Sequence, residues 1–565
     1  MRASRCRLPL VVPAMLALAG LLSGCSPSHD RAHHGEGGPM SIAPDVGERL
    51  ARFEPTEIGA DLSGLSASQK EVLDHLIAAS REMNAIFLRQ AWTGNPEMRE
   101  ALASSDDPLA PQALDYFDIS FGPWDRLDES AFVGTAARPE GAGFYPDDMT
   151  KEEFEAWLEA NPADREAFRS LYTVIRRDGD RLVAVPYSEA FAEWLGPAAE
   201  HLRAAAAATE SESLRDYLTK VAIAFAADDY YDSDVAWMDL DSRVEVTIGP
   251  YETYEDRMFG YKASFESFVT VADPEQSAAL ARYKSLLPDM ERNLPIPEEH
   301  KNPNRGSESP IRVVDEVFTA GDTRAGVQTI AFNLPNDERV REAKGSKKVL
   351  LRNVMDAKFQ SILVPIANVV LAPEQAGMVD AESFFNEVLF HELSHGLGPG
   401  RIFLDGRETE VRLELKELYS PMEEAKADVM GVYNILYLMD RGLYPGKDRK
   451  ALLATYVAGL FRATRFGVAE AHGRGAALQF HYLLEKGGVA ADESRGIVTV
   501  DFEAMEPAIR GLVRDLCLLQ AMGDYAGTRE MLDSLGVLTP AMEIPLGRME
   551  DIPVDIRPVY PAAGD

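Results

Sequence analysis

The chain has 565 residues, of which 46% are hydrophobic and 26% charged, as in an ordinary globular protein rather than a disordered one. This length exceeds what one small core needs, so two or more lobes are expected. The formal net charge of −35 argues against a nucleic-acid partner, because phosphates would be repelled rather than neutralised.

Residues 1–24 predict a signal peptide. Three arginines precede an apolar stretch at 8–22 that is too short to cross a bilayer comfortably. The sequence LSGC that ends at Cys25 resembles the lipobox of bacterial lipoproteins, in which the cysteine is lipidated. This resemblance implies a periplasmic protein held by a lipid anchor, and Ser26 favours the outer membrane of a Gram-negative bacterium. The alternative is a plain secretory signal cleaved near Gly24, in which Cys25 has no role.

The rest of the chain predicts an α+β fold that is mainly helical. Residues 25–44 are polar and rich in Gly and Pro, which predicts a flexible tether. Helical patterns follow at 66–92, where Ser66 and Gln69 form a predicted capping box, and at 150–176, 187–227 and 274–290. Strands are expected within 242–272 and 310–335, helices again after about 355, and an extended Pro-rich segment at 553–561.

The helix expected from Asp380 to His395 carries a candidate metal site. Asp380 can cap its first turn, and the glycines that follow His395 end it. His391-Glu392-x-x-His395 places two imidazoles one turn apart on one face, where they can bind one zinc ion. Glu392 lies beside them and can act as general base toward a water molecule. The alternative is a surface helix end with two histidines at its negative pole.

A second predicted helix supplies a third ligand. Glu424 follows His395 by 29 residues and shares a helix face with Asp428. Glu424 can then bind zinc while Asp428 accepts the remaining N–H of a ligand histidine and fixes its tautomer. Acidic residues at a helix start also occur simply because the helix dipole favours them, and that alternative stays open.

Several segments, in this order, resemble the dipeptidyl peptidase III family of zinc exopeptidases. The matching segments are Glu252-Thr253-Tyr254-x-Asp256, Phe265-Glu266-Ser267-Phe268, Asn333-Leu334-Pro335-Asn336, His391-Glu392-Leu393-Ser394-His395, Glu423-Glu424-Ala425-Lys426-Ala427-Asp428 and Ala471-His472. Many family members have one more residue before the second histidine. The five-residue version resembles that of bacterial members and of the peptidase-like half of a plant Nudix protein. No Nudix box is present in this sequence.

The resemblance implies two lobes across a cleft: a mixed lobe with a β-barrel, at about 45–272, 316–361 and 546–565, and a helical zinc lobe, at about 273–315 and 362–545. It also implies that Tyr254 and His472 stabilise the transition state, and that Glu252, Asn333 and Asn336 hold the amino end of the peptide. For Tyr254 the alternative is an ordinary packed aromatic residue, and for His472 a structural histidine beside Glu470 and Arg474.

The expected function is therefore release of dipeptides from the amino end of short peptides, with one zinc per chain, His391, His395 and Glu424 as ligands and Glu392 as base. Two alternatives remain open at this point. One is a zinc hydrolase of a non-peptide substrate. The other is a non-catalytic, zinc-stabilised lipoprotein that binds peptides, which an intact Glu392 disfavours.

Overall fold

The computed structural model describes residues 41–301, 311–444 and 448–564. The expected signal peptide, Cys25 and most of the expected tether lie outside the described residues. Residues 41–44, the end of that tether, already contact the folded body: Ile42 forms a β-bridge with Val133, and Gly134 N–H donates to the Ser41 carbonyl at 2.8 Å. Residues 41–44, which were predicted as part of the tether, are therefore in contact with the folded body.

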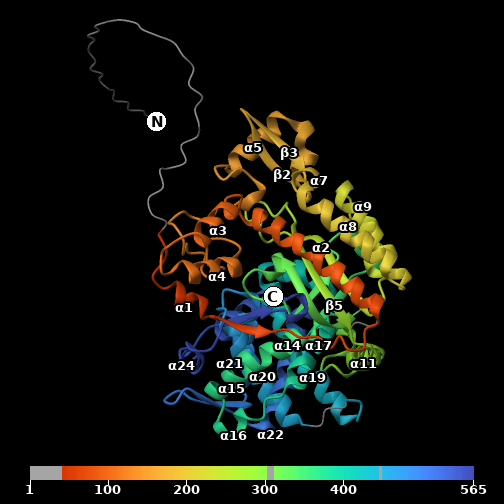
Figure 1. Cartoon of the computed structure of the whole chain (residues 1–565). Coiled ribbons are helices and arrows are strands. Elements are labelled where there is room, and N and C mark those ends of the chain that lie inside the picture. Colours follow the sequence, from red (N-terminus) through yellow and green to blue (C-terminus); the bar gives the residue numbers. More distant parts are fainter. Residues whose placement is uncertain (1–40, 302–310, 445–447, 565) are drawn as a thin grey trace, which may run out of the picture. The chain divides into compact units, whose positions relative to one another are not determined.

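Helices dominate the first part of the chain (Figure 1). The predicted capping box is confirmed: Ser66 Oγ accepts from Gln69 N–H, and Gln69 Oε1 accepts from Ser66 N–H, at the start of a helix of 25 residues. This helix packs along α8 and against the sheet. The helices up to the first long strand are α1 (Val46–Leu50), α2 (Ala67–Ala91), α3 (Asn95–Ala103), α4 (Ala110–Ser120), α5 (Lys151–Ala160), α6 (Arg165–Arg169), α7 (Tyr187–Ala190), α8 (Ala192–Ala208), α9 (Glu212–Ala227) and α10 (Tyr231–Met238).

One predicted helix is wrong at its end. The expectation for 150–176 holds for α5 and α6, but β2 (Thr173–Asp178) is a strand that pairs with β3 (Arg181–Pro186) in an antiparallel hairpin. The run Thr173-Val174-Ile175 is β-branched, which favours a strand, and Gly179 turns the chain with a φ of 58°.

A five-stranded sheet occupies the middle of the chain, in the order β4-β5-β6-β8-β7. Neighbouring strands are antiparallel except β6 and β8, which are parallel. Every residue of β5 is buried, so both of its faces are covered. The strands are β4 (Val244–Glu252), β5 (Ser264–Ala272), β6 (Ile311–Gly321), β7 (Ala331–Leu334) and β8 (Lys347–Leu351).

The expected β-barrel is wrong for the described residues, because no ladder joins the two edge strands β4 and β7. β7 has only four residues and is followed by Pro335, which has no N–H to extend a ladder. A side chain alone bridges the strand ends: Asn336 Nδ2 donates to the Tyr251 carbonyl at 3.1 Å.

Helices make up most of the remaining chain and pack side by side, α17 on α19, and α19 on α21 and α22 (Figure 1). They are α11 (Pro274–Ser285), α12 (Leu287–Asn293), α13 (Glu338–Lys344), α14 (Arg352–Lys358), α15 (Val364–Val370), α16 (Pro373–Ala376), α17 (Ala381–Ser394), α18 (Val411–Leu415), α19 (Tyr419–Asp440), α20 (Arg449–Thr464), α21 (Ala471–Glu485), α22 (Phe502–Ala521), α23 (Tyr525–Leu535) and α24 (Pro540–Leu546). Two short hairpins interrupt them, β9 (Arg401–Leu404) with β10 (Arg407–Glu410), and β11 (Val489–Asp492) with β12 (Ile497–Val500).

The two ends of the described chain pair with each other. β1 (Phe53–Glu57) runs parallel to β13 (Asp555–Val559), which is the extended segment expected at 553–561. Asp555 is buried and ion-paired with the buried Lys358 of α14 at 2.8 Å, so this strand is also anchored to the centre of the chain. Residues 41–565 pack as one compact unit, and the division into two lobes stays a prediction.

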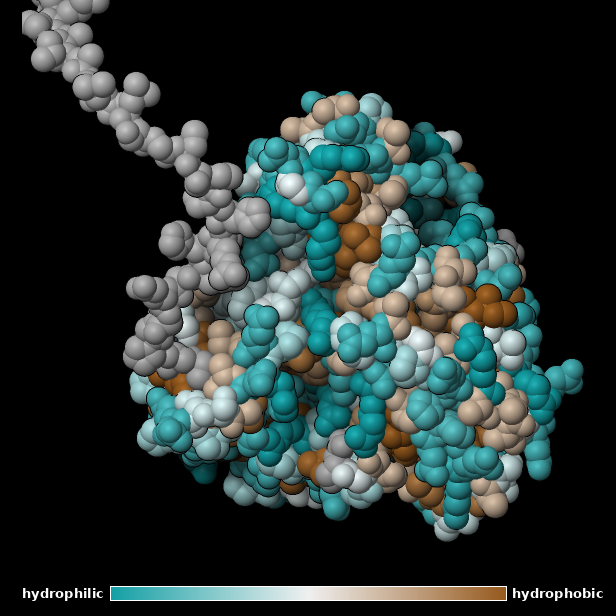
Figure 2. All heavy atoms as spheres, turned by 45° about the horizontal axis from the view of Figure 1, so that its top comes forward, coloured by the Kyte–Doolittle hydropathy of each residue, from teal (hydrophilic) through white to brown (hydrophobic). Residues whose placement is uncertain are grey.

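The surface drawn in Figure 2 mixes hydrophilic side chains with small apolar patches. Within the part of the chain that the structure describes, no helix has both the length and the apolarity to cross a membrane.

Candidate metal centre

Helix α17 presents the two histidines. It begins at Asp380, whose carboxylate accepts a hydrogen bond from Ser383 N–H at 2.8 Å, and it ends at Ser394. Phe384 and Leu389 are buried and fix which side of the helix faces the protein. His391 and His395 therefore lie on one side, one turn apart, with their Nε2 atoms separated by 3.1 Å.

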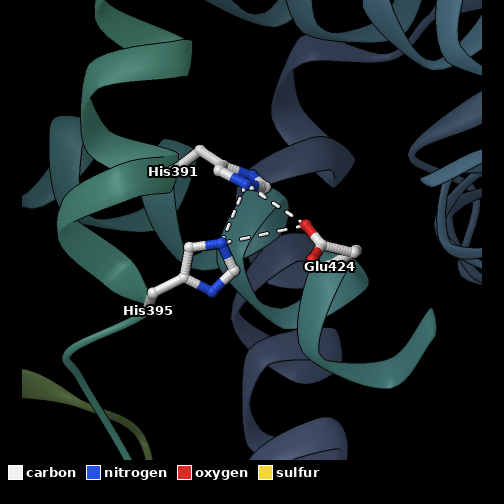
Figure 3. Close-up of side chains that lie close together, drawn as sticks. All are labelled: His391, His395 and Glu424. Atoms are coloured by element: carbon white, nitrogen blue, oxygen red, sulfur yellow. Dashed lines mark hydrogen bonds and ion pairs between the residues drawn. The ribbon is translucent and has the colours of Figure 1, made fainter. Parts of the chain in front are cut away.

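Helix α19 brings a carboxylate to the same point. Glu424 Oε2 lies 3.3 Å from His391 Nε2 and 3.8 Å from His395 Nε2, and Figure 3 shows the three side chains converging. The two helices can approach closely because residue 431 of α19 is a glycine: a Cβ there would lie 3.0 Å from the backbone nitrogen of His391.

These three side chains fit a zinc ion. With bonds of about 2.0–2.1 Å, the ligand atoms of a tetrahedral zinc lie roughly 3.3 Å apart, close to the separations of 3.1–3.8 Å found here. Glu424 Oε2 is shielded from solvent and has no hydrogen bond, which is costly unless an ion faces it. Two imidazoles and a carboxylate are a donor set that zinc prefers. His391, His395 and Glu424 could therefore hold a metal ion.

Asp428 orients the first histidine. Its Oδ1 lies 2.6 Å from His391 Nδ1, which leaves Nε2 free to face the metal position. Gln479 of α21 donates to Asp428 Oδ2 at 3.1 Å and holds the carboxylate in place. Burial alone would raise the pKa of Asp428, but His391, together with Gln479 and His472, keeps the pKa below its ordinary value.

Glu423 does the same for the second histidine, a partner that the sequence did not single out. Its Oε1 lies 3.0 Å from His395 Nδ1 and 2.8 Å from the buried Lys426 Nζ, and Gln520 donates to its Oε2 at 2.9 Å. Burial opposes its charge, yet Lys426 and His395 lower the pKa of Glu423 to about 2. The sequence pattern singled out the neighbouring Glu424 as a metal ligand. Nothing in the spacing of residues indicated that Glu423 would contact a histidine.

Glu392 is paired with a lysine from the sheet. Lys348 of β8 places its Nζ 2.6 Å from Glu392 Oε2 and also donates to the Glu392 carbonyl at 3.0 Å. Burial would raise the pKa of Glu392, but the charge of Lys348, and then of His391, lowers it, so the carboxylate is ionised. Lys348 was missed by the sequence analysis because nothing in its own strand marks it as functional.

His472 stands at the rim of this cluster. It lies in the first turn of α21, where Glu470 caps the helix. Its Nε2 is 3.3 Å from Glu424 Oε2, and 57% of the side chain is exposed. The structure thus places His472 where it can reach a group bound beside Glu424.

Tyr254 is not brought to the cluster. It lies in the turn after β4 and is 82% exposed, and it has no hydrogen bond to a candidate ligand among the described residues. The turn itself is firmly built: the buried Glu255 pairs with Arg126 at 2.6 Å, and Asp256 accepts from the backbone N–H of Tyr261 at 2.8 Å. The Glu252 carboxylate raises the pKa of Tyr254, so its hydroxyl stays protonated and can donate.

The expected peptide-binding residues lie at the ends of β4 and β7. Asn336 Nδ2 donates to Glu252 Oε1 at 3.2 Å, so these two side chains form one polar group. Burial raises the pKa of Glu252, and Asn336 partly offsets this. Asn333 is exposed on β7, directly across the strand pair from Lys348.

Comparison with known protein families and structures identifies the class of protein that carries this cluster of side chains. Residues 148–436 match the sequence model of Peptidase family M49, and the site and the match together define a metallopeptidase. The fold is similar to the structure of DPP III from Caldithrix abyssi, with a TM-score of 0.88 and 52% identity, covering 91% of this chain and 98% of that one. It is also similar to dipeptidyl-peptidase III from Corallococcus sp. strain EGB, with a TM-score of 0.77 and 40% identity over 93% of this chain and 98% of that one.

The chain belongs to peptidase family M49, the dipeptidyl peptidase III family. Among curated proteins, Nudix hydrolase 3 of Arabidopsis thaliana is 37% identical over 91% of this chain and 74% of its own length. The predicted resemblance to this family is confirmed, including the similarity to a plant Nudix protein.

Proposed function

We propose that this protein is a zinc-dependent dipeptidyl peptidase that removes two residues at a time from the free amino end of short peptides. The observation that carries the proposal is the convergence of His391, His395 and Glu424, with the ionised Glu392 beside them. A metal site that served stability alone would not need a carboxylate held as a base next to its ligands.

The edge strand β7 is suited to hold an extended peptide. In the described part of the chain, one edge of β7 pairs with β8 and no strand pairs with the other. Unpaired backbone N–H and C=O groups of an edge strand bind a peptide as an added strand. Beyond the end of β7, Glu252 and Asn336 offer a carboxylate and an amide oxygen to the peptide's ammonium group, a charge-assisted contact.

The proton transfers fall to Glu392. Zinc held by His391, His395 and Glu424 would supply Lewis acidity that polarises the peptide carbonyl. Glu392 takes a proton from the attacking water and passes it to the leaving amine, a role typically worth about 10²–10⁴ in rate. Lys348 keeps Glu392 ionised before reaction and fixes its direction. His472, and Tyr254 through its protonated hydroxyl, are proposed to donate hydrogen bonds to the oxygen on which charge develops.

The test combines metal content with hydrolysis of a panel of dipeptidyl-naphthylamides. Purified protein should contain about one zinc per chain, lose activity to a chelator and regain it with zinc. Glu392→Gln should keep the zinc and lose roughly 10²–10⁴ in turnover, whereas Glu424→Gln should lose the zinc. Normal turnover by Glu392→Gln, or full zinc content in Glu424→Gln, would remove the proposed roles.

Periplasmic location through a lipid on Cys25 is proposed from the sequence alone. A single anchoring signal predicts that the protein fractionates with membranes, and that Cys25→Ser yields a soluble protein or an unprocessed precursor. A Cys25→Ser variant that is cleaved and still membrane-bound would show another means of attachment.

A further inference from the structure

A cavity of about 280 Å³ opens directly beside the metal centre. Its walls come from Ile330 and Ala331 at the start of β7, where Ile330 immediately precedes the strand, from α17 (Glu387 and His391) and from α20 (Gly459 and Arg462). The cavity thus touches both the edge strand proposed to hold the peptide and the helix that carries the histidines. Nothing in the mechanism above uses its far wall.

Glu387 gives this wall an unsatisfied polar group. It lies one turn before His391 on α17, and its Oε1 atom is shielded from solvent without a hydrogen bond. A buried carboxyl without a partner destabilises the folded protein, so a ligand group that donates to it would be bound favourably. Burial, and then the charges of Asp428 and Asp380, raise the pKa of Glu387 well above its ordinary value.

Gly459 leaves space in front of this carboxyl. It lies inside α20, where glycine is unfavourable for the helix. A Cβ at this position would have Glu387 Oε2 as its nearest neighbour, at 3.8 Å. The missing side chain therefore keeps the approach to Glu387 open.

Arg462 lies at another part of the wall, beside Phe384. Its guanidinium stacks on Phe384 at 5.5 Å, and burial lowers its pKa while Asp555 opposes that change. Among the described residues that line the cavity, Glu387, Glu392 and Asp428 are acidic, and Arg462 is the one arginine or lysine. The end of the cavity at Glu387 is therefore acidic.

The register of β7 shows which part of a peptide reaches the cavity. Asn333 is level with Lys348, whose ammonium touches Glu392, so the cleaved bond lies near Asn333. Asn336, which contributes to the proposed ammonium site, lies beyond one end of β7, and Ala331 lies at the other end. Ala331 and Asn333 share a face of the strand, about 7 Å apart. A peptide whose amine is held at Asn336 therefore extends past the cleaved bond toward the cavity.

We infer that this cavity receives the side chain of the residue that follows the cleaved bond (P1′), and that Glu387 selects a side chain ending in a cation, lysine or arginine. The inference rests on the proposed function, because it takes the dipeptide length as fixed by Glu252 and Asn336. A lysine ammonium supplies the donor that Glu387 Oε1 lacks, and its aliphatic stem lies against the apolar part of the wall.

The test measures kcat/KM for tetrapeptides Ala-Ala-Xaa-Ala, in which Xaa is lysine, methionine or glutamate. Methionine matches the length of lysine without its charge. Lysine should be preferred over methionine by about tenfold, or about 1.4 kcal/mol, and glutamate should be the poorest. In Glu387→Gln the lysine-to-methionine ratio should fall to about one. Glu382→Gln, an exposed acid on the same helix, should keep the ratio of the unchanged protein.

Three further measurements separate selection from damage to the neighbouring metal centre. Zinc content of Glu387→Gln should equal that of the unchanged protein. Gly459→Ala should lower the preference for lysine without lowering Tm, because alanine is favoured over glycine inside a helix. In a Glu392→Gln background, calorimetry should show the same lysine preference in Kd, and Glu387→Gln should remove it there too.

A lysine-to-methionine ratio near one in the unchanged protein, or a ratio that survives Glu387→Gln, would overturn the inference while leaving dipeptide release intact. If no dipeptide is released from any of these peptides, the proposed function fails instead.

Discussion

Both histidines of the candidate metal centre are held by a carboxylate. Asp428 lies at Nδ1 of His391 and Glu423 at Nδ1 of His395, while Lys348 pairs with Glu392. Because their Nδ1 atoms already have partners, the two histidines turn their Nε2 atoms toward each other and toward Glu424. Tyr254, in contrast, is not held by a partner of this kind among the described residues and is mostly exposed. The contacts that stabilise its turn are made by the neighbouring Glu255 and Asp256.

The hydroxyl of Tyr254 can be tested as a hydrogen-bond donor in catalysis. If this hydroxyl donates to the developing oxyanion, Tyr254→Phe should lower kcat by roughly 10²-fold, the cost of one lost donor. Zinc content and Tm should not change, because the exposed hydroxyl supports no part of the fold. Steady-state kinetics on a dipeptidyl-naphthylamide, with Tyr231→Phe as a control in α10, measure the effect. An unchanged kcat would make Tyr254 a surface aromatic without a catalytic role.

At the scale of elements, the site depends on how closely α17 and α19 pack. Gly431 faces the backbone of α17 at the level of His391 and leaves no room for a methyl group. Gly431→Ala should therefore push the helices apart by a few tenths of an ångström, weaken zinc binding and lower Tm.

A matched control lies in α8, where a Cβ at Gly196 would meet nothing within 4 Å. Gly196→Ala should leave zinc affinity unchanged and stabilise the protein by about 0.5–1 kcal/mol, since alanine is preferred in a helix. Competition with a chelator gives the zinc affinity of both variants. Equal affinity in Gly431→Ala and the unchanged protein would show that the close packing does not position the ligands.

Features that depend on residues close together in the sequence could be predicted, whereas features that depend on contacts between distant segments could not. The cap at Ser66 depends only on residues of α2, and the cap at Asp380 and the i, i+4 histidines depend only on residues of α17. Each of these features was predicted from the spacing of residues in the sequence. Lys348, Glu423 and Glu387 act through contacts that depend on packing between separate elements, so no local pattern marks them. The strand at Thr173 was predicted as helix because a helical pattern precedes its β-branched residues. The predicted barrel is not closed because β7 is short and does not pair with β4.

At the scale of the whole molecule, the buried pair Lys358–Asp555 connects the last strand to α14. Asp555→Ala would remove the carboxylate that stabilises the buried Lys358 ammonium, which costs about 3–5 kcal/mol. The free energy of unfolding, from urea denaturation, should fall by that amount. Asp551→Ala, at an exposed position nearby, should change it by less than about 0.5 kcal/mol. A small effect at Asp555 would mean that the chain ends contribute little to stability.

This metallopeptidase is proposed to release two residues at a time from a free amino end. Mass spectrometry of a timed digest tests this proposal most directly, using one hexapeptide with a free and with an acetylated amino end. The free peptide should lose dipeptides in succession. The acetylated peptide should be cut at least roughly tenfold more slowly, because Glu252 would be left without its ammonium partner. Equal cleavage of both peptides, or fragments that begin at internal positions, would contradict the dipeptidyl account.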